Sequence, residues 1–179
     1  YGPPALAFQP NFEEYVTLYY EKFGKRRCMY DTPSTSGAWI ASNYACMPEH
    51  ARYYLMESAM NGVQGFLMFH YTGLEGKQLQ VNAEVFGAFA LVDDLITQGR
   101  RMNDLKIDGK EMHARGLRLG DERLVLAGDY YVSTDKRTGV LTCPVGTRLP
   151  VYDVLKRRKL GYLTPKNNKI ALTLEGLND

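Results

Sequence analysis

The sequence predicts an α+β fold: one mixed domain with helices mainly in its N-terminal half and a small mixed sheet in its C-terminal half. The 179 residues are 45% hydrophobic and 23% charged, which is the balance of a globular domain. Apolar residues recur at helical spacing up to Gly99, and short glycine-punctuated segments rich in strand formers follow. No linker is long or biased enough to divide residues 1–179. We therefore expect a single domain.

The first half is expected to contain three helices and one buried strand. Residues 1–24 form an N-terminal helical segment in this prediction, because Phe12, Tyr15, Val16 and Tyr19 recur at three- and four-residue steps. The other predicted elements are a helix that opens at Pro48 and stops at Asn61, a buried strand over residues 65–71, and a helix over residues 82–98 that ends at Gly99.

The second half is expected to be mostly strand. The predicted strands cover residues 105–108, 122–127, 129–133, 140–143 and, as an edge strand, 169–174. One short helix is expected among them, with Pro150 in its first turn and Val151, Val154 and Leu155 on its apolar side.

Charge and cysteine content limit the function classes. The formal net charge is +2, so any contact with nucleic acid requires a local basic patch. The three cysteines are widely separated and form no Cys-x-x-Cys pair, which indicates neither a disulfide framework nor a zinc ribbon. No signal peptide and no apolar stretch of about 20 residues is visible. A cytoplasmic protein without a membrane span is the expectation.

The segment from Val140 to Arg158 is the most informative. A predicted strand leads into a glycine turn and then into the predicted helix, so backbone amides and the positive helix end would converge on an anion. Within it, the expected phosphate-binding residues are Gly146, Thr147, Arg148, Lys156, Arg157 and Arg158. The alternative is an ordinary strand-to-helix turn with a solvated basic end.

The order Gly146-x-Arg148, followed by Tyr152-x-x-Leu155, resembles the strand, Gly-x-x-Arg turn and helix of the ParB and sulfiredoxin superfamily. The stretch from Leu124 to Gly128 also resembles the lead into this turn, with the acidic Asp129 after it, so the two placements compete. The resemblance implies a ParB/Srx-like strand-turn-helix near the C-terminus that binds nucleotide phosphates.

In size and texture the chain resembles the plasmid-encoded fertility-inhibition (oncogenic suppression) members of that superfamily. This resemblance implies ATPase and DNase activity with ATP and Mg²⁺ as cofactors. It also implies DNA and nucleotide as partners, and interference with DNA transfer through a type IV secretion system, with a coupling protein of that system as a further partner.

Nuclease chemistry would need carboxylates that hold a divalent cation near the phosphate. The candidate carboxylates are Glu84, Asp93, Asp94, Asp121 and Glu122. Of these, Glu84 and Asp93, together with Arg148, are the expected catalytic residues. Asp93 and Asp94 project in different directions from a helix, so at most one of the two is expected to face a site.

Two rival functions stay open. The strand that ends in His70 and Tyr71 resembles the opening of ADP-ribosyltransferase-like enzymes, which implies NAD binding and a distant acid, for which Asp129, Asp135 and Glu175 are available. The other rival is a non-catalytic protein-binding inhibitor that uses the surface of a chain with 13 tyrosines.

Overall fold

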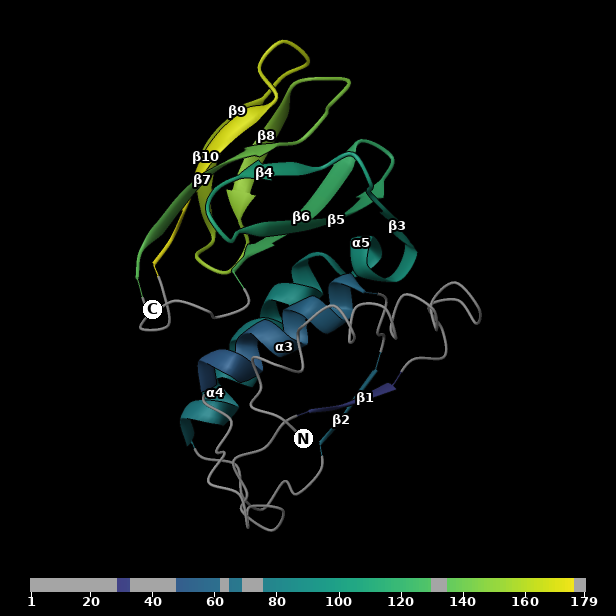
Figure 1. The fold of residues 1–179 in the computed structure, drawn as a ribbon. Coiled ribbons are helices and arrows are strands. Elements are labelled where there is room, and N and C mark those ends of the chain that lie inside the picture. Colours follow the sequence, from purple (N-terminus) through teal and green to yellow (C-terminus); the bar gives the residue numbers. More distant parts are fainter. Residues whose placement is uncertain (1–28, 33–47, 62–64, 69–75, 130–134, 176–179) are drawn as a thin grey trace. The chain divides into compact units, whose positions relative to one another are not determined.

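The computed structural model describes residues 29–32, 48–61, 65–68, 76–129 and 135–175 (Figure 1). Its helices precede most of its strands, and most of its strand pairs are antiparallel. This confirms a mixed α+β fold whose helices lie mainly in the N-terminal half. The predicted helical segment over residues 1–24 lies outside the described residues.

The contacts of the chain group into two compact units, Tyr1–Gly87 and Ala88–Asp179. The single domain over residues 1–179 stays a prediction. Within the described part of the chain, no helix combines the length and the apolarity that crossing a bilayer requires.

The first unit contains a pair of parallel strands, β1 (Met29–Thr32) and β2 (Gly65–Met68). Helix α3 (Pro48–Met60) lies between them in sequence, as the crossover of a parallel pair requires. Its start at Pro48 and its end beside Asn61 confirm the prediction. The side chain of Asn61 closes the last turn, because its Nδ2 donates to the carbonyl oxygen of Glu57 over 2.9 Å.

The helix predicted over residues 82–98 is two helices. Helix α4 (Gly76–Leu91) begins earlier than predicted, and α5 (Asp93–Gln98) follows after Val92, whose φ of −131° and ψ of 24° are not helical. Asp93 and Asp94 occupy the first turn of α5, where negative charge complements the helix dipole. The break at Val92 therefore gives these two acids a new helix start.

The second unit contains two three-stranded sheets and one hairpin (Figure 1). The first sheet has the order β3-β5-β6, and its strands are β3 (Arg100–Arg101), β5 (His113–Leu119) and β6 (Glu122–Gly128). The second sheet has the order β10-β7-β4, and its strands are β4 (Lys106–Asp108), β7 (Arg137–Thr142) and β10 (Lys169–Leu174). The edge position predicted for residues 169–174 is confirmed. Most of the strand predicted over residues 129–133 lies outside the described residues.

The helix predicted after Pro150 is wrong. The chain forms an antiparallel hairpin there, made of β8 (Leu149–Asp153) and β9 (Arg158–Leu163). Leu149 and Val151 pack against the core of the unit, whereas Pro150 and Tyr152 are exposed, and this period-2 alternation belongs to a strand. Pro150 is tolerated because β8 pairs with β9 alone. The expected strand-turn-helix is therefore a strand, a loop and a hairpin.

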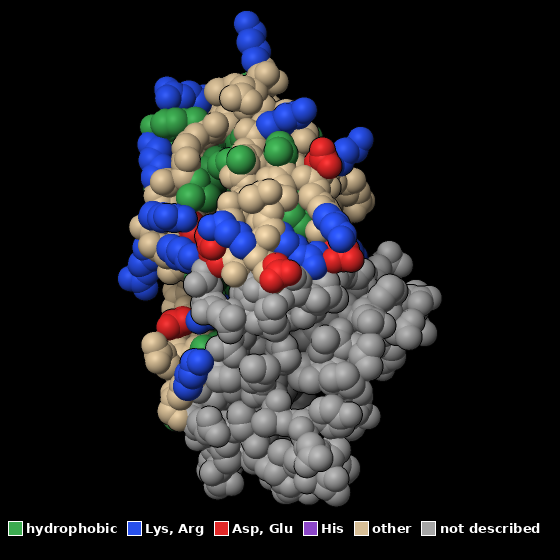
Figure 2. Space-filling model, turned by 60° about the vertical axis from the view of Figure 1, so that its left-hand side comes forward, with side chains coloured by type: hydrophobic (Ala, Val, Ile, Leu, Met, Phe, Trp, Pro, Cys, Tyr) green, Lys and Arg blue, Asp and Glu red, His purple; other side chains and the backbone are tan. Residues whose placement is uncertain are grey.

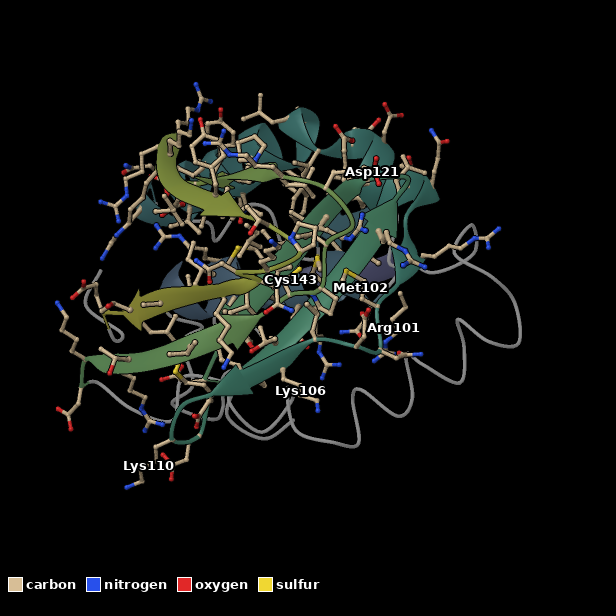
Figure 3. All side chains as sticks on the ribbon, turned by 90° about the horizontal axis from the view of Figure 1, so that it is seen from above. Arg101, Met102, Lys106, Lys110, Asp121 and Cys143 are labelled. Atoms are coloured by element: carbon tan, nitrogen blue, oxygen red, sulfur yellow. The ribbon has the colours of Figure 1, made fainter. Side chains whose placement is uncertain are left out.

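One hydrophobic core holds the second unit together. Its buried members come from three segments of this unit and are Met102, Leu141, Cys143, Val145 and Leu163. Met102 and Cys143 lie among the strands (Figure 3). Leu149 and Val151 of β8 and Leu163 of β9 belong to the same cluster, so the hairpin is fixed to both sheets by its inner face.

Candidate nucleic-acid interface

Positive charge is concentrated in the second unit. Residues 88–179 contain 16 Lys and Arg against 12 Asp and Glu, whereas residues 1–87 contain 6 against 8. Residues 148–169 alone contain seven Lys and Arg and one acid, Asp153. In Figure 2, Lys and Arg side chains spread over the described part of the surface with fewer acidic side chains between them. Although the net charge of the whole chain is small, residues 148–169, which include the β8–β9 hairpin, are strongly basic.

The hairpin separates apolar from polar side chains by its pairing. Leu149 pairs directly with Leu163 on the inner face, while Pro150 pairs with Tyr162 on the outer face. The register shifts after Val151, so Tyr152 pairs with Lys159 and Leu160 is the extra residue of a bulge. Burial of the inner face therefore holds the two tyrosines and Lys159 on the solvent side.

The tip of the hairpin presents four consecutive cations. Lys156, Arg157, Arg158 and Lys159 are all exposed. Oδ1 of Asp153 accepts a hydrogen bond of 3.0 Å from the backbone amide of Lys156, and Oδ2 lies 4.0 Å from Nε of Arg158. Arg157 has a φ of 49°, the left-handed conformation that closes the turn. The turn geometry thus directs the charged side chains away from the core.

Two cations from different segments meet at Tyr162. The guanidinium carbon of Arg148, in the loop before β8, lies 3.9 Å from the centre of the Tyr162 ring, and Nζ of Lys159 lies 3.9 Å from the same centre. Lys159 also donates a hydrogen bond to the phenolic oxygen of Tyr162. This bond, and then the charges of Lys159 and Arg148, lower the pKa of Tyr162 below its ordinary value.

The turn from Gly146 to Arg148 is open to solvent, but the helix predicted to follow it is not formed. Gly146, Thr147 and Arg148 are exposed, and a strand follows them. The contribution of a helix end to anion binding therefore does not exist here. A Cβ added to Gly146 would meet nothing within 4 Å, and its φ is not positive, so the turn does not require glycine. The side-chain groups of this turn that could still bind an anion are the guanidinium of Arg148 and the hydroxyl of Thr147.

The competing turn at Gly128 is less suited to an anion. Gly128 ends β6 and is buried, and the next residue is the buried Asp129. Nε of Arg137 lies 3.6 Å from Oδ2 of Asp129, and Nη1 of Arg137 lies 2.7 Å from Oε2 of Glu111. Two carboxylates thus already neutralise this guanidinium, which disfavours a phosphate beside it.

The predicted carboxylates each have their own local surroundings. Glu84 lies on α4 in the first unit and accepts a hydrogen bond of 2.8 Å from Nη2 of Arg52. Asp93 and Asp94 are exposed on α5, where Oδ1 of Asp94 accepts from Gln98 over 2.9 Å. Among the residues that the structure describes, no three His, Cys, Asp or Glu side chains are grouped as a metal site requires.

The remaining candidate acids lie at turns and strand ends. Asp121 and Glu122 are exposed at the turn between β5 and β6 (Figure 3 labels Asp121). The catalytic roles of Arg148, Asp93 and Glu84 therefore stay predictions.

The residues of the two rival functions are described only in part. His70 and Tyr71 lie outside the described residues. Of the three acids considered with them, Asp129 is paired with Arg137, Glu175 lies 2.9 Å from Nζ of Lys136, and Asp135 is exposed.

Sequence reasoning missed Tyr152 and Tyr162, whose exposed fractions are 57% and 44%. The alternation of Leu149, Pro150, Val151 and Tyr152 is the sequence signal for a strand that would have placed Tyr152 outward. It also missed Lys166, which is exposed in a turn where the hydroxyl of Thr164 accepts from the amide of Asn167 over 2.9 Å.

Comparisons of the chain with models of protein families, with curated proteins and with solved structures found no match. Membership of the ParB and sulfiredoxin superfamily therefore stays a prediction.

Proposed function

We propose that the second unit binds nucleic acid through the β8–β9 hairpin. The residues that would contact the phosphates are Arg148, Lys156, Arg157, Arg158 and Lys159. The observation that carries the proposal is the charge of residues 148–163, five cations against one acid, on and directly before a hairpin whose inner face is fixed to the core. A polyanion that contacts several of these cations releases its condensed counterions, which makes binding favourable at low salt.

The availability of the cations supports this proposal. Among the described residues, Arg158 is the one hairpin cation within 4.0 Å of a carboxylate, and that contact with Asp153 is at the limit of an ion pair. Cations that are not neutralised within the protein keep their charge for an external partner. Arg157 lies at the tip of the hairpin and Arg148 lies beside Tyr162, so one phosphodiester backbone could contact both side chains.

The proposal concerns binding. ATP hydrolysis, DNA cleavage with Mg²⁺ and interference with a type IV secretion system are predictions from the resemblance, and the described carboxylates add no support to them. Hydrolysis of ATP and nicking of a plasmid can be measured on the same purified protein as nucleic-acid binding.

The test is the salt dependence of binding to a labelled DNA oligonucleotide, measured by fluorescence polarisation. The logarithm of the association constant should fall linearly with the logarithm of the salt concentration, with a slope of about −0.7 to −0.9 for each phosphate contact. The double substitution Arg157→Gln and Arg158→Gln should weaken binding and reduce the slope by roughly 1.5 to 2.

The matched control removes two positive charges elsewhere in the same unit. Lys110 and Lys136 are exposed on other elements, and Lys110→Gln with Lys136→Gln changes the net charge by the same amount. This control should keep most of the affinity and the slope. Absence of binding at low salt, or an equal loss in the control, would overturn the proposal.

A further inference from the structure

We infer that the hairpin selects single-stranded nucleic acid, because Tyr152 and Tyr162 offer stacking surfaces for unpaired bases. This inference rests on the proposed function and names the class of polynucleotide that the same surface would bind.

The two tyrosines lie on one face of the hairpin. Tyr162 of β9 pairs with Pro150 of β8. Tyr152 lies two residues after Pro150 on β8, so the two tyrosines are diagonal neighbours across the ladder. Diagonal neighbours in an antiparallel pair are about 7–8 Å apart, and the bulge at Leu160 lies between the two pairs that contain these tyrosines. Both rings keep a large exposed area, 57% for Tyr152 and 44% for Tyr162. Two neighbouring bases of one strand could therefore each contact a ring.

Each ring has a cation beside it. Arg148 and Lys159 lie over the Tyr162 ring, each 3.9 Å from its centre, so a base would stack on the part of this ring that they leave exposed; Lys159 is also the direct cross-strand partner of Tyr152. A nucleotide carries a negatively charged phosphate close to its base. A tyrosine ring can stack on the base while the adjacent cation contacts the phosphate. A scattered exposed tyrosine would have no such significance, whereas two on one basic face do.

The arrangement favours single strands over duplexes for a geometric reason. In a duplex, neighbouring base pairs cover the faces of each base, so a ring outside the helix cannot stack on them. A duplex could then contact only the cations, whereas a single strand could contact both the cations and the two rings. The aromatic contribution should therefore be specific to unpaired bases.

The experiment compares three labelled ligands of equal length with the full chain: oligothymidylate, an abasic oligonucleotide and a DNA duplex. Oligothymidylate should bind about 25- to 10,000-fold more tightly than the abasic strand, which carries the same phosphates but loses the stacking contacts with both rings. Tyr162→Leu and Tyr152→Leu should each weaken binding of oligothymidylate about 5- to 100-fold. Their affinity for the abasic strand and their salt slope should not change.

Two control variants separate stacking from other losses. Tyr162→Phe keeps the ring and loses the hydrogen bond from Lys159, so it should recover most of the oligothymidylate affinity that Tyr162→Leu loses. Leu160→Ala removes an exposed apolar side chain from the bulge between the rings and should have little effect. Thermal unfolding of each variant checks that the hairpin is intact.

The outcomes distinguish the two proposals. If none of the three ligands binds with a salt dependence, the proposed function itself fails. If all three bind with a salt dependence but with equal affinity, nucleic-acid binding stands and the inference of single-strand selection is overturned. The inference is also overturned if the Tyr→Leu variants weaken binding of the abasic strand as much as binding of oligothymidylate.

Discussion

The carboxylate of Asp153 closes the tip of the β8–β9 hairpin, because its Oδ1 accepts a hydrogen bond of 3.0 Å from the backbone amide of Lys156. Asp153 is also the one acid in residues 148–169. The same side chain therefore orders the turn that presents the cations and lowers the positive charge that they create.

These two roles can be separated by substitution. Asp153→Asn keeps an acceptor oxygen for the amide of Lys156 and removes the charge, so nucleic-acid affinity should rise while the free energy of unfolding changes little. Asp153→Ala loses the hydrogen bond as well and should lower the free energy of unfolding by about 0.5–1.5 kcal/mol. Urea unfolding and fluorescence polarisation measure the two effects. Weaker binding by the Asn variant would contradict the proposed interface.

Two glycines in the second unit should respond differently to alanine. A Cβ at Gly139 would lie 2.7 Å from Sδ of Met112 and 3.0 Å from the carbonyl oxygen of Asp108, so Gly139→Ala should cost about 1–3 kcal/mol of stability. Gly146→Ala meets open space and should change the free energy of unfolding by less than about 0.5 kcal/mol.

Denaturant unfolding of both alanine variants checks this pair. Adding Met112→Ala to Gly139→Ala should recover part of the loss, because the sulfur then no longer occupies the space. Equal stability of the two single variants would show that the close packing around Gly139 is relieved without cost.

Much of the fold could be predicted from local sequence, and the wrongly predicted helix after Pro150 has a cause that is not local. Strands β4, β6, β7 and β10 were found because strand-forming residues lie between glycines or turns. The spacing of Val151, Val154 and Leu155 suits a helix equally well, and the strand is selected by docking of Leu149 and Val151 onto a core that includes Leu163. That contact is not local in sequence.

Strand β5 was missed for a different reason. Its residues Ala114 and Gly116 are small, so the segment shows no alternation of large apolar and polar residues. Leu117 is buried all the same. The basic residues of the interface were visible in the sequence. The approach of Arg148 to Tyr162 was not, because it depends on the pairing register between two strands.

The phenol of Tyr162 should ionise below the ordinary range of tyrosine. The hydrogen bond from Lys159 stabilises the phenolate and lowers the pKa of Tyr162, so Lys159→Met should raise that pKa toward about 10. The difference in absorbance near 295 nm between each protein and its Tyr162→Phe variant isolates this residue from the other tyrosines. An unchanged midpoint in the Lys159→Met variant would contradict the contact.

The thiol of Cys143 should be unreactive in the folded protein. Burial raises the pKa of Cys143 above its ordinary value, and only the thiolate reacts with an alkylating reagent. Iodoacetamide should label Cys143 much more slowly in native buffer than in urea, as measured by mass spectrometry of its peptide. Equal labelling rates would show that the core opens readily.

The same shift gives a pH dependence with a definite sign. Because the thiol keeps its proton to higher pH in the folded chain, deprotonation favours the unfolded chain. The contribution of Cys143 to stability should be intact below about pH 9 and should decline above it. A Cys143→Ala variant should lack this part of the decline.

The alternation along β8 determines which kinds of sequence change the hairpin can accept. Substitutions at Tyr152 alter the contact surface and leave the inner face unchanged, so binding preference can be redesigned one side chain at a time. Insertion of a single residue after Leu149 would instead exchange the faces, turning Val151 toward water and Tyr152 toward the core. The hairpin should therefore tolerate wide variation in side-chain identity and almost none in the length of β8.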